Sequence, residues 1–236
     1  MADAVVVVGA SGGLGRAFVD RFVGDGLHSA VWALSRGGEA MSGARGLKAD
    51  VTDQASLAEA ARRIADGPAP ARIVVATGVL HAPFQPERGF RQMEPEHLMR
   101  DFQVNAVGPA MAAKHLAPLM PRDRPAVFAV LSARVGSIGD NRLGGWHAYR
   151  ASKAALNMIL RNLAIELGRT HPNAVVTGLH PGTVNTPLSL PFQKGLAPDR
   201  LFAPAYAVDR LVEVMDRLTP ADSGGVFDWA GQRLPD

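Results

Sequence analysis

The sequence predicts an α/β protein in which one doubly wound parallel sheet of about seven strands carries helices on both faces. Short apolar runs, several of them apolar at every position, alternate along the chain with longer amphipathic segments. Parallel strands buried on both faces produce such runs, and the helices that cover them produce the amphipathic segments. A glycine-rich turn also joins the first run to the first amphipathic segment, as is typical of this fold class.

The expected elements follow one another without an internal repeat or a break in composition, so we expect residues 1–236 to form a single domain. The apolar runs predict strands at 4–9, 30–35, 46–50, 72–78, 126–132, 174–180 and 224–231, and the amphipathic segments predict helices near 13–24, 53–66, 94–120, 149–170 and 204–218. The stretch from 180 to 204 is long for a connection in a compact domain and mixes proline with apolar residues. Long loops of this kind are more often lids or binding loops than simple connectors.

Composition narrows the function classes. The net charge is only +3, from 25 Lys and Arg against 22 Asp and Glu, and no basic run follows the chain, so we expect no nucleic-acid partner. There are no cysteines, which excludes disulfides and thiolate metal sites and suits a cytoplasmic protein. The longest apolar runs are too short to cross a membrane, and the N-terminal run has no cationic lead, so we expect neither membrane partner nor signal peptide.

The turn after the first strand carries glycines at 9, 12, 13 and 15 just before a helical pattern. Such a turn permits tight backbone geometry and lets a pyrophosphate approach the helix N-terminus, where free N–H groups and the helix dipole favour an anion. In this strand-turn-helix context it predicts a dinucleotide site. The alternative is a turn that only needs small residues.

The second strand ends in Ser35 and Arg36, where an NAD site would have an acidic residue for the ribose hydroxyls. A guanidinium pairs well with the extra phosphate of NADP, and a carboxylate would repel it. We therefore expect NADP(H), with NAD(H) less favoured; the alternative is a solvated surface arginine. Asp50, at the end of the third strand, either accepts a bond from an adenine amino group or caps the helix that starts near Asp53.

Tyr149 and Lys153 stand four residues apart at the start of a predicted helix, so their side chains lie one turn apart on one face. A free tyrosine has a pKa near 10 and is only about 0.1% phenolate at pH 7. A lysine one turn away supplies the positive charge that lowers such a pKa. The pair therefore suggests proton transfer to or from an alcohol, unless it is a chance spacing on a packed helix.

Three motifs, G9-A-S-G-G13-L-G15, Y149-R-A-S-K153 and P181-G-T-V-N-T186, together resemble the short-chain dehydrogenase/reductase family over nearly the whole chain. The stretch from Gly136 to Asn157 is most similar to the sniffer-like carbonyl reductase and C-factor branch. The resemblance implies a Rossmann fold, hydride transfer between nicotinamide and a carbonyl or alcohol substrate, no metal, and a homodimer or homotetramer. It also implies that Lys153 holds the nicotinamide ribose.

By the same resemblance, the cofactor site spans the glycine turn, the ends of the next strands and the PGTVNT stretch. The expected cofactor-binding residues are Gly9, Ser11, Gly12, Gly13, Leu14, Gly15, Ser35, Arg36, Asp50, Val51, Thr77, Gly78, Tyr149, Lys153, Pro181, Gly182, Val184 and Thr186.

Asn105 precedes a proline that changes the hydrogen bonding of its helix. Pro109 has no N–H, so the carbonyl of Asn105, its i−4 partner, is left without its usual bond. The family resemblance implies that Asn105 anchors a water in a proton relay from lysine to solvent. The alternative is a kink that serves packing alone.

The chain departs from the family pattern at the serine that usually orients the substrate carbonyl, because Ala133 occupies the position that matches the motif. Ser132 and Ser137 are the two possible replacements. We expect Ser132, since its hydroxyl lies at the strand end, although on a regular strand it would face the other side from residue 133.

These features predict an NADP-dependent oxidoreductase with catalytic Asn105, Ser132, Tyr149 and Lys153 and a substrate loop at about 183–204. The apolar loop residues suggest a lid over a medium-sized organic carbonyl. The alternative is a weakly active dinucleotide-binding redox sensor or interaction protein. Ala133 keeps that alternative open, and the intact Tyr149 and Lys153 argue against it.

Overall fold

The computed structural model describes residues 2–81 and 83–236 and is built around a seven-stranded parallel sheet with the order β3-β2-β1-β4-β5-β6-β9. The predicted doubly wound sheet is therefore confirmed. Its strands are β1 (Ala4–Val8), β2 (Ala30–Ser35), β3 (Arg45–Lys48), β4 (Pro70–Val75), β5 (Ala126–Leu131), β6 (Ala174–His180) and β9 (Val226–Asp228). The chain moves outward from β1 to β3 and then returns past β1 to β4. Such a reversal leaves a crevice at the carboxyl ends of the strands.

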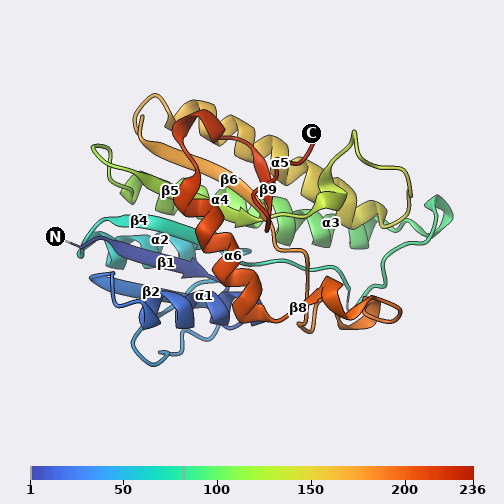
Figure 1. Cartoon of the computed structure of the whole chain (residues 1–236), viewed down its shortest axis with the longest axis horizontal. Coiled ribbons are helices and arrows are strands. Elements are labelled where there is room, and N and C mark those ends of the chain that lie inside the picture. The colour runs from blue at the N-terminus through green and yellow to red at the C-terminus, as the bar shows by residue number, and fades with distance from the viewer. Residues whose placement is uncertain (1, 82) are drawn as a thin grey trace.

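Helices cover both faces of the sheet (Figure 1). They are α1 (Gly13–Gly24), α2 (Gln54–Ala65), α3 (Pro95–Phe102), α4 (Gly108–Leu116), α5 (His147–Leu167) and α6 (Pro204–Arg217), with short 3-10 turns at Phe90–Gln92, Ala117–Leu119, Arg134–Gly136, Leu190–Phe192, Pro198–Arg200 and Pro220–Asp222. α1 and α6 pack together on one face, and α2, α4 and α5 pack side by side on the other.

The alternation of side chains along the strands divides the core into two layers. In β1, Val5 and Val7 belong to the layer that holds Phe18 of α1 and Leu211 of α6. Val6, the residue between them, belongs to the opposite layer, with residues of α2, α4 and α5. Every residue of β1 is buried, because successive side chains of a strand point to opposite faces and both faces are covered.

The helix predicted at 94–120 is one helical stretch but not one α-helix. A π-helix (Gln103–Val107) separates α3 from α4, and the N–H of Gly108 bonds the carbonyl of Gln103, five residues back. Two local constraints fit this break. Pro109 cannot donate a hydrogen bond, and a Cβ on Gly108 would lie 2.9 Å from Val51.

Other predicted boundaries shift by a few residues. The last strand is only Val226–Asp228, because Gly224 before it has a φ of +83°. β3 ends at Lys48, so Asp50 lies beyond the strand, and α5 begins two residues before Tyr149. Among the described residues, no helix is both long and apolar enough to cross a membrane.

The long segment after β6 is more ordered than a plain loop. β7 (Thr183–Val184) pairs in parallel with β8 (Leu201–Phe202), so the two ends of the segment are tied together. The residues between them pass through two 3-10 turns and project beyond the sheet at the carboxyl ends of the strands (Figure 1).

Candidate active site

The glycine-rich turn needs its glycines for identifiable steric reasons. Gly9 has a φ of +85°, and a Cβ on Gly15 would lie 2.1 Å from the carbonyl oxygen of Gly9. A Cβ on Gly13 would lie 2.7 Å from Cγ2 of Thr186, which brings the start of α1 against the PGTVNT stretch. The N-cap of α1 is Gly12, so no side chain caps the helix and its first N–H groups are not covered by a capping side chain. These features fit the pyrophosphate of a dinucleotide.

A cavity of about 260 Å³ gathers most of the nicotinamide-side predictions. It combines the glycine turn, the end of β4, the end of β5, α5 and the segment after β6. Its lining includes the predicted residues Gly12, Gly13, Leu14, Thr77, Gly78, Ser132, Tyr149, Lys153, Pro181 and Thr186. Segments that are far apart in the sequence therefore meet where the fold places the crevice.

Tyr149 and Lys153 are both buried in this cavity wall, at 9% and 2% exposure. Lys153 Nζ lies 5.8 Å from the centroid of the Tyr149 ring and donates to the carbonyl of Leu131 at 2.8 Å. Burial lowers the pKa of Lys153 to about 8, whereas burial, and then the charge of Asp101, raises the pKa of Tyr149. In this environment the tyrosine holds its proton, as a proton donor to a carbonyl must.

Asn105 links this wall to the loop after β4. Its Oδ1 accepts from the N–H of Val79 at 2.9 Å, and its Nδ2 donates to the Val79 carbonyl at 2.9 Å and to Ser152 Oγ at 3.1 Å. Ser152 in turn donates to the carbonyl of Tyr149 at 2.8 Å. The Asn105 side chain thus fixes the backbone on both sides of the cavity. Its role in a water relay stays a prediction.

The two candidate serines occupy different places. Ser132 lines the cavity and places its hydroxyl 2.7 Å from Asn157 Oδ1. Ser137 donates to the carbonyl of Asp236 at 3.2 Å and accepts from the N–H of Asp140 at 3.1 Å, and it does not line the cavities described here. Of the two, Ser132 is the one beside Tyr149.

A second cavity of about 280 Å³ continues from Tyr149 toward the segment that begins at β7. It shares the predicted residues Leu14, Ser132, Tyr149, Pro181 and Thr186 with the first cavity and adds the predicted Gly182 and Val184. Its lining also includes Ala133, Trp146, His180, Ser189 and Phe192. The rings of Trp146 and Phe192 meet with centroids 4.9 Å apart, which gives this cavity an apolar wall.

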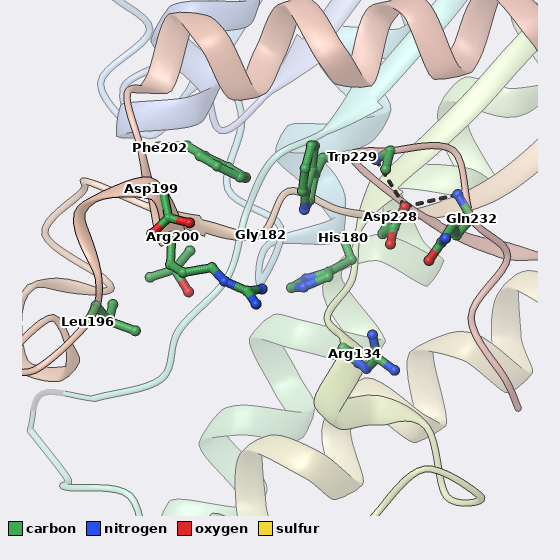
Figure 2. Close-up of a pocket in the computed structure, with 12 residues that line it drawn as sticks. Arg134, His180, Gly182, Leu196, Asp199, Arg200, Phe202, Asp228, Trp229 and Gln232 are labelled. Atoms are coloured by element: carbon green, nitrogen blue, oxygen red, sulfur yellow. Dashed lines mark hydrogen bonds between the residues drawn. The ribbon is translucent and has the colours of Figure 1, made fainter.

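A larger cavity of about 730 Å³ adjoins the second one and shares Arg134, His180 and Gly182 with it. Figure 2 shows His180 and Arg134 on its wall, with Arg200 and Trp229 contributed by later segments. Burial lowers the pKa of His180 to about 4, so its imidazole is neutral at pH 7. The sequence indicates His180 as a structural or substrate-lining residue, and it lines both cavities, whereas Trp146 and Arg134 were not predicted to line them.

The remaining predicted cofactor residues lie at the carboxyl ends of β2 and β3. Ser35 is buried and Arg36 is exposed. Sequence reasoning missed Glu39, whose carboxylate accepts from the Ser35 hydroxyl at 3.1 Å and lies against Gly37, so that a negative charge stands next to both chain neighbours of Arg36.

The other predicted cofactor residues are Asp50 and Val51, which follow β3, and Ser11, which lies in the glycine turn. Hydrogen bonds from Thr52, at 2.9 Å from its N–H and 2.8 Å from its hydroxyl, lower the pKa of Asp50. Val51 is buried against Gly108, and Ser11 is exposed at the tip of the glycine turn.

Comparisons with known proteins agree with this geometry. A family model described as short chain dehydrogenase matches residues 3–196. The C-signal protein of Myxococcus xanthus is 36% identical over 139 residues, which are 58% of this chain and 78% of that protein. An NADPH-bound carbonyl reductase from chicken fatty liver has a TM-score of 0.86 at 23% identity, covering 100% of this chain and 99% of its own. A short-chain dehydrogenase/reductase from Burkholderia multivorans with bound NADP has a TM-score of 0.82 at 25% identity, over 100% of both chains.

Replacing Asn105 tests whether its amide holds the cavity wall together. Asn105→Ala removes a fully buried side chain and leaves the partly buried N–H and carbonyl of Val79 without their partners, and we expect the free energy of unfolding to fall by about 2–4 kcal/mol. Urea unfolding followed by circular dichroism measures it. Gln103→Ala, an exposed change in the same π-helix, should stay within about 0.5 kcal/mol of the wild type. Equal losses for the two variants would contradict this role.

Proposed function

The chain belongs to the short-chain dehydrogenase family, and we propose that it is an NADP(H)-dependent oxidoreductase acting on a carbonyl or alcohol substrate. The observation that carries the proposal is the shared cavity in which Tyr149 and Lys153 meet the glycine turn and Thr186. The glycines leave room for a dinucleotide backbone there, and the neighbouring cavity has an apolar wall suited to an organic substrate.

Each residue of the site has a role in this proposal. NADPH, when bound, supplies the hydride for reduction. Tyr149 donates its proton to the carbonyl oxygen through its phenol hydroxyl, and the charge on Lys153 stabilises the phenolate that remains. Ser132, beside Tyr149, orients the substrate oxygen, and Asn105 anchors the water that returns a proton from solvent. The glycine turn and Thr186 hold the phosphates and the nicotinamide.

Parallel titration with NADPH and NADH, followed by a panel of aldehydes and ketones, tests the function. We expect NADPH binding and substrate-dependent oxidation, and Tyr149→Phe should lower kcat by about 100-fold or more with little change in NADPH affinity. Tyr206→Phe, which removes the other, half-exposed tyrosine, is the matched control and should keep the wild-type rate.

Three outcomes separate the possible functions. Equal turnover in the two tyrosine variants would refute the role of Tyr149. Nucleotide binding without turnover of any carbonyl would favour a redox sensor or interaction protein. No binding of either nucleotide would exclude both functions.

The preference for NADP(H) rests on Arg36, and the NADP bound to the relative from Burkholderia multivorans supports it. Glu39 acts against it, because its carboxylate lies on Ser35 beside the same position. The two side chains therefore set the selectivity jointly, with Arg36 attracting a ribose phosphate and Glu39 favouring free ribose hydroxyls.

Opposite effects are expected when these two residues are changed. Arg36→Ala should weaken NADPH binding by about tenfold or more and leave NADH binding nearly unchanged, because only NADPH has the extra phosphate. Glu39→Gln should strengthen NADPH binding and weaken NADH binding. Fluorescence titration measures both affinities, with Arg62→Ala on the exposed side of α2 as the control. If Arg36→Ala weakens both cofactors equally, Arg36 does not read the phosphate.

The segment at about 183–204 is proposed to be the substrate loop. Val184 and Phe192 line the cavity beside Tyr149, and the β7–β8 pairing fixes the ends of the segment near Gly182. Lys194, in the middle of the segment, and Arg200, just before β8, are exposed, which makes both positions accessible to trypsin.

Limited trypsin digestion tests this assignment. Bound NADPH should slow cleavage after Lys194 and Arg200 by packing the segment over the cofactor. Cleavage after Arg142, exposed in a different loop, should keep its rate and serves as the internal reference. Unchanged cleavage at all three positions would show that the segment does not close over the cofactor.

A further inference from the structure

Asn157 lies one turn beyond Lys153 and two turns beyond Tyr149 on the same face of α5. Its amide contacts the serine of the proposed site, because the Ser132 hydroxyl donates to Asn157 Oδ1 at 2.7 Å. One turn earlier, Lys153 Nζ donates to the carbonyl of Leu131 at 2.8 Å. Two successive turns of α5 therefore bind two successive residues at the end of β5.

The hydrogen-bonding capacity of Ser132 is already partly used. Ser132 is 5% exposed and lines both cavities that contain Tyr149. A serine hydroxyl has one hydrogen to donate and two lone pairs that accept. The hydrogen of Ser132 goes to Asn157, and no described group donates to the Ser132 oxygen. In this arrangement Ser132 has acceptor capacity left for a substrate, but no hydrogen to donate.

A carbonyl substrate needs the opposite arrangement. Its oxygen accepts hydrogen bonds and cannot donate them, so Ser132 can orient it only when the hydroxyl hydrogen is released from Asn157. If the Asn157 amide turns over by half a rotation, Nδ2 takes the place of Oδ1 and donates to Ser132 Oγ. One hydrogen bond then replaces another, and the hydroxyl hydrogen becomes available to the substrate.

The amide of Asn157 can turn over without losing other hydrogen bonds. Asn157 also lines a cavity of about 250 Å³ that includes neither Ser132 nor Tyr149. Its Nδ2 has no hydrogen-bond partner in the part of the chain that the structure describes. Asn105 differs, because its amide makes three hydrogen bonds that a reversal would break. Of these two asparagines, Asn157 is the one whose donor and acceptor can exchange places.

We propose that Asn157 is a positioning residue for Ser132, accepting the hydroxyl hydrogen in the free enzyme and donating to the hydroxyl oxygen when a carbonyl substrate is bound. This inference rests on the proposed function, in which Ser132 orients the substrate oxygen. It assigns to one amide the choice between an acceptor and a donor at the site, so that the same serine can serve a carbonyl or an alcohol.

The absence of cysteine from the chain allows a direct test of the contact. Ser132→Cys introduces a single thiol in place of the hydroxyl. The S–H stretch of a thiol lies in a region of the infrared spectrum where other protein groups do not absorb, and it moves to lower frequency when the thiol donates a hydrogen bond. The measurement uses the free protein, without nucleotide or substrate.

In the Ser132→Cys background, Asn157→Leu should move the S–H band to higher frequency, because the acceptor has been removed. Asn157→Asp keeps an acceptor, so the band should stay at low frequency. The matched control is Met158→Leu, which changes the next residue of α5 in the wall of the same cavity and should leave the band in place. A band that does not move in Asn157→Leu would overturn the inference.

Kinetics with and without Ser132 separate positioning from packing, and they do not require the Ser132→Cys protein to fold. Asn157→Leu and Asn157→Asp should each lower kcat for carbonyl reduction by about tenfold, with little change in the KM for NADPH. The aspartate variant has nearly the shape of asparagine but cannot donate as a carboxylate. In the Ser132→Ala background, both changes should alter kcat by less than about twofold, because the hydroxyl that they position is gone.

The two measurements fail in distinguishable ways. Equal losses of kcat with and without the Ser132 hydroxyl would show that Asn157 acts by packing or by charge, and would also overturn the inference. An enzyme that turns over no carbonyl would contradict the proposed function, whereas the infrared comparison would still show whether Asn157 holds the hydrogen of residue 132.

Discussion

The close approach of the chain to itself at the glycine turn is the constraint on which the rest of the site depends. A methyl group on Gly15 would lie 2.1 Å from the Gly9 carbonyl oxygen, so α1 can start this close to β1 only without a side chain there. The same closeness brings Gly13 to the side chain of Thr186, from a segment more than 170 residues later. The reversal of the sheet between β1 and β4 opens a crevice beside this contact, and Tyr149 and Lys153 reach it from the other side.

Burial shifts the pKa of both Tyr149 and Lys153, the two residues to which we assign the proton transfer. Removing Tyr149 and Lys153 from water disfavours the charged form of each, so the phenol keeps its proton more firmly and the ammonium holds its own less firmly. Proton donation needs a neutral tyrosine beside a charged lysine. Burial alone supports the first requirement and opposes the second.

The sequence predicted the parts of this protein that follow from local pattern. Uninterrupted apolar runs identify strands buried on both faces, and β6 matches its predicted bounds. The spacing of Tyr149 and Lys153 places them on one helix face, and the departure at Ala133 directed attention to Ser132, which lies in the cavity wall.

The features that were missed depend on contacts between distant segments or on backbone geometry. Glu87 caps α5 from 61 positions away, and no property of either segment alone indicates that contact. The left-handed backbone of Trp146 is unexpected for a large aromatic residue. The π-helix at Gln103–Val107 replaces what reads as continuous helix, since the sequence shows Pro109 but not the packing of Gly108 on Val51.

The β7–β8 pairing has an evolutionary consequence. Two residues at each end of the segment pair with each other and fix its attachment points. The stretch between them is therefore expected to tolerate changes in length and composition, as surface loops do. Gly182, just before β7, has a φ of +74°, and a Cβ there would lie 2.7 Å from the ring of Phe202 in β8. The residue that precedes the segment therefore lies close to the strand that ends it. Under the proposed function, substitutions in the stretch between β7 and β8 are expected to change which substrates enter the cavity and to leave the nucleotide site intact.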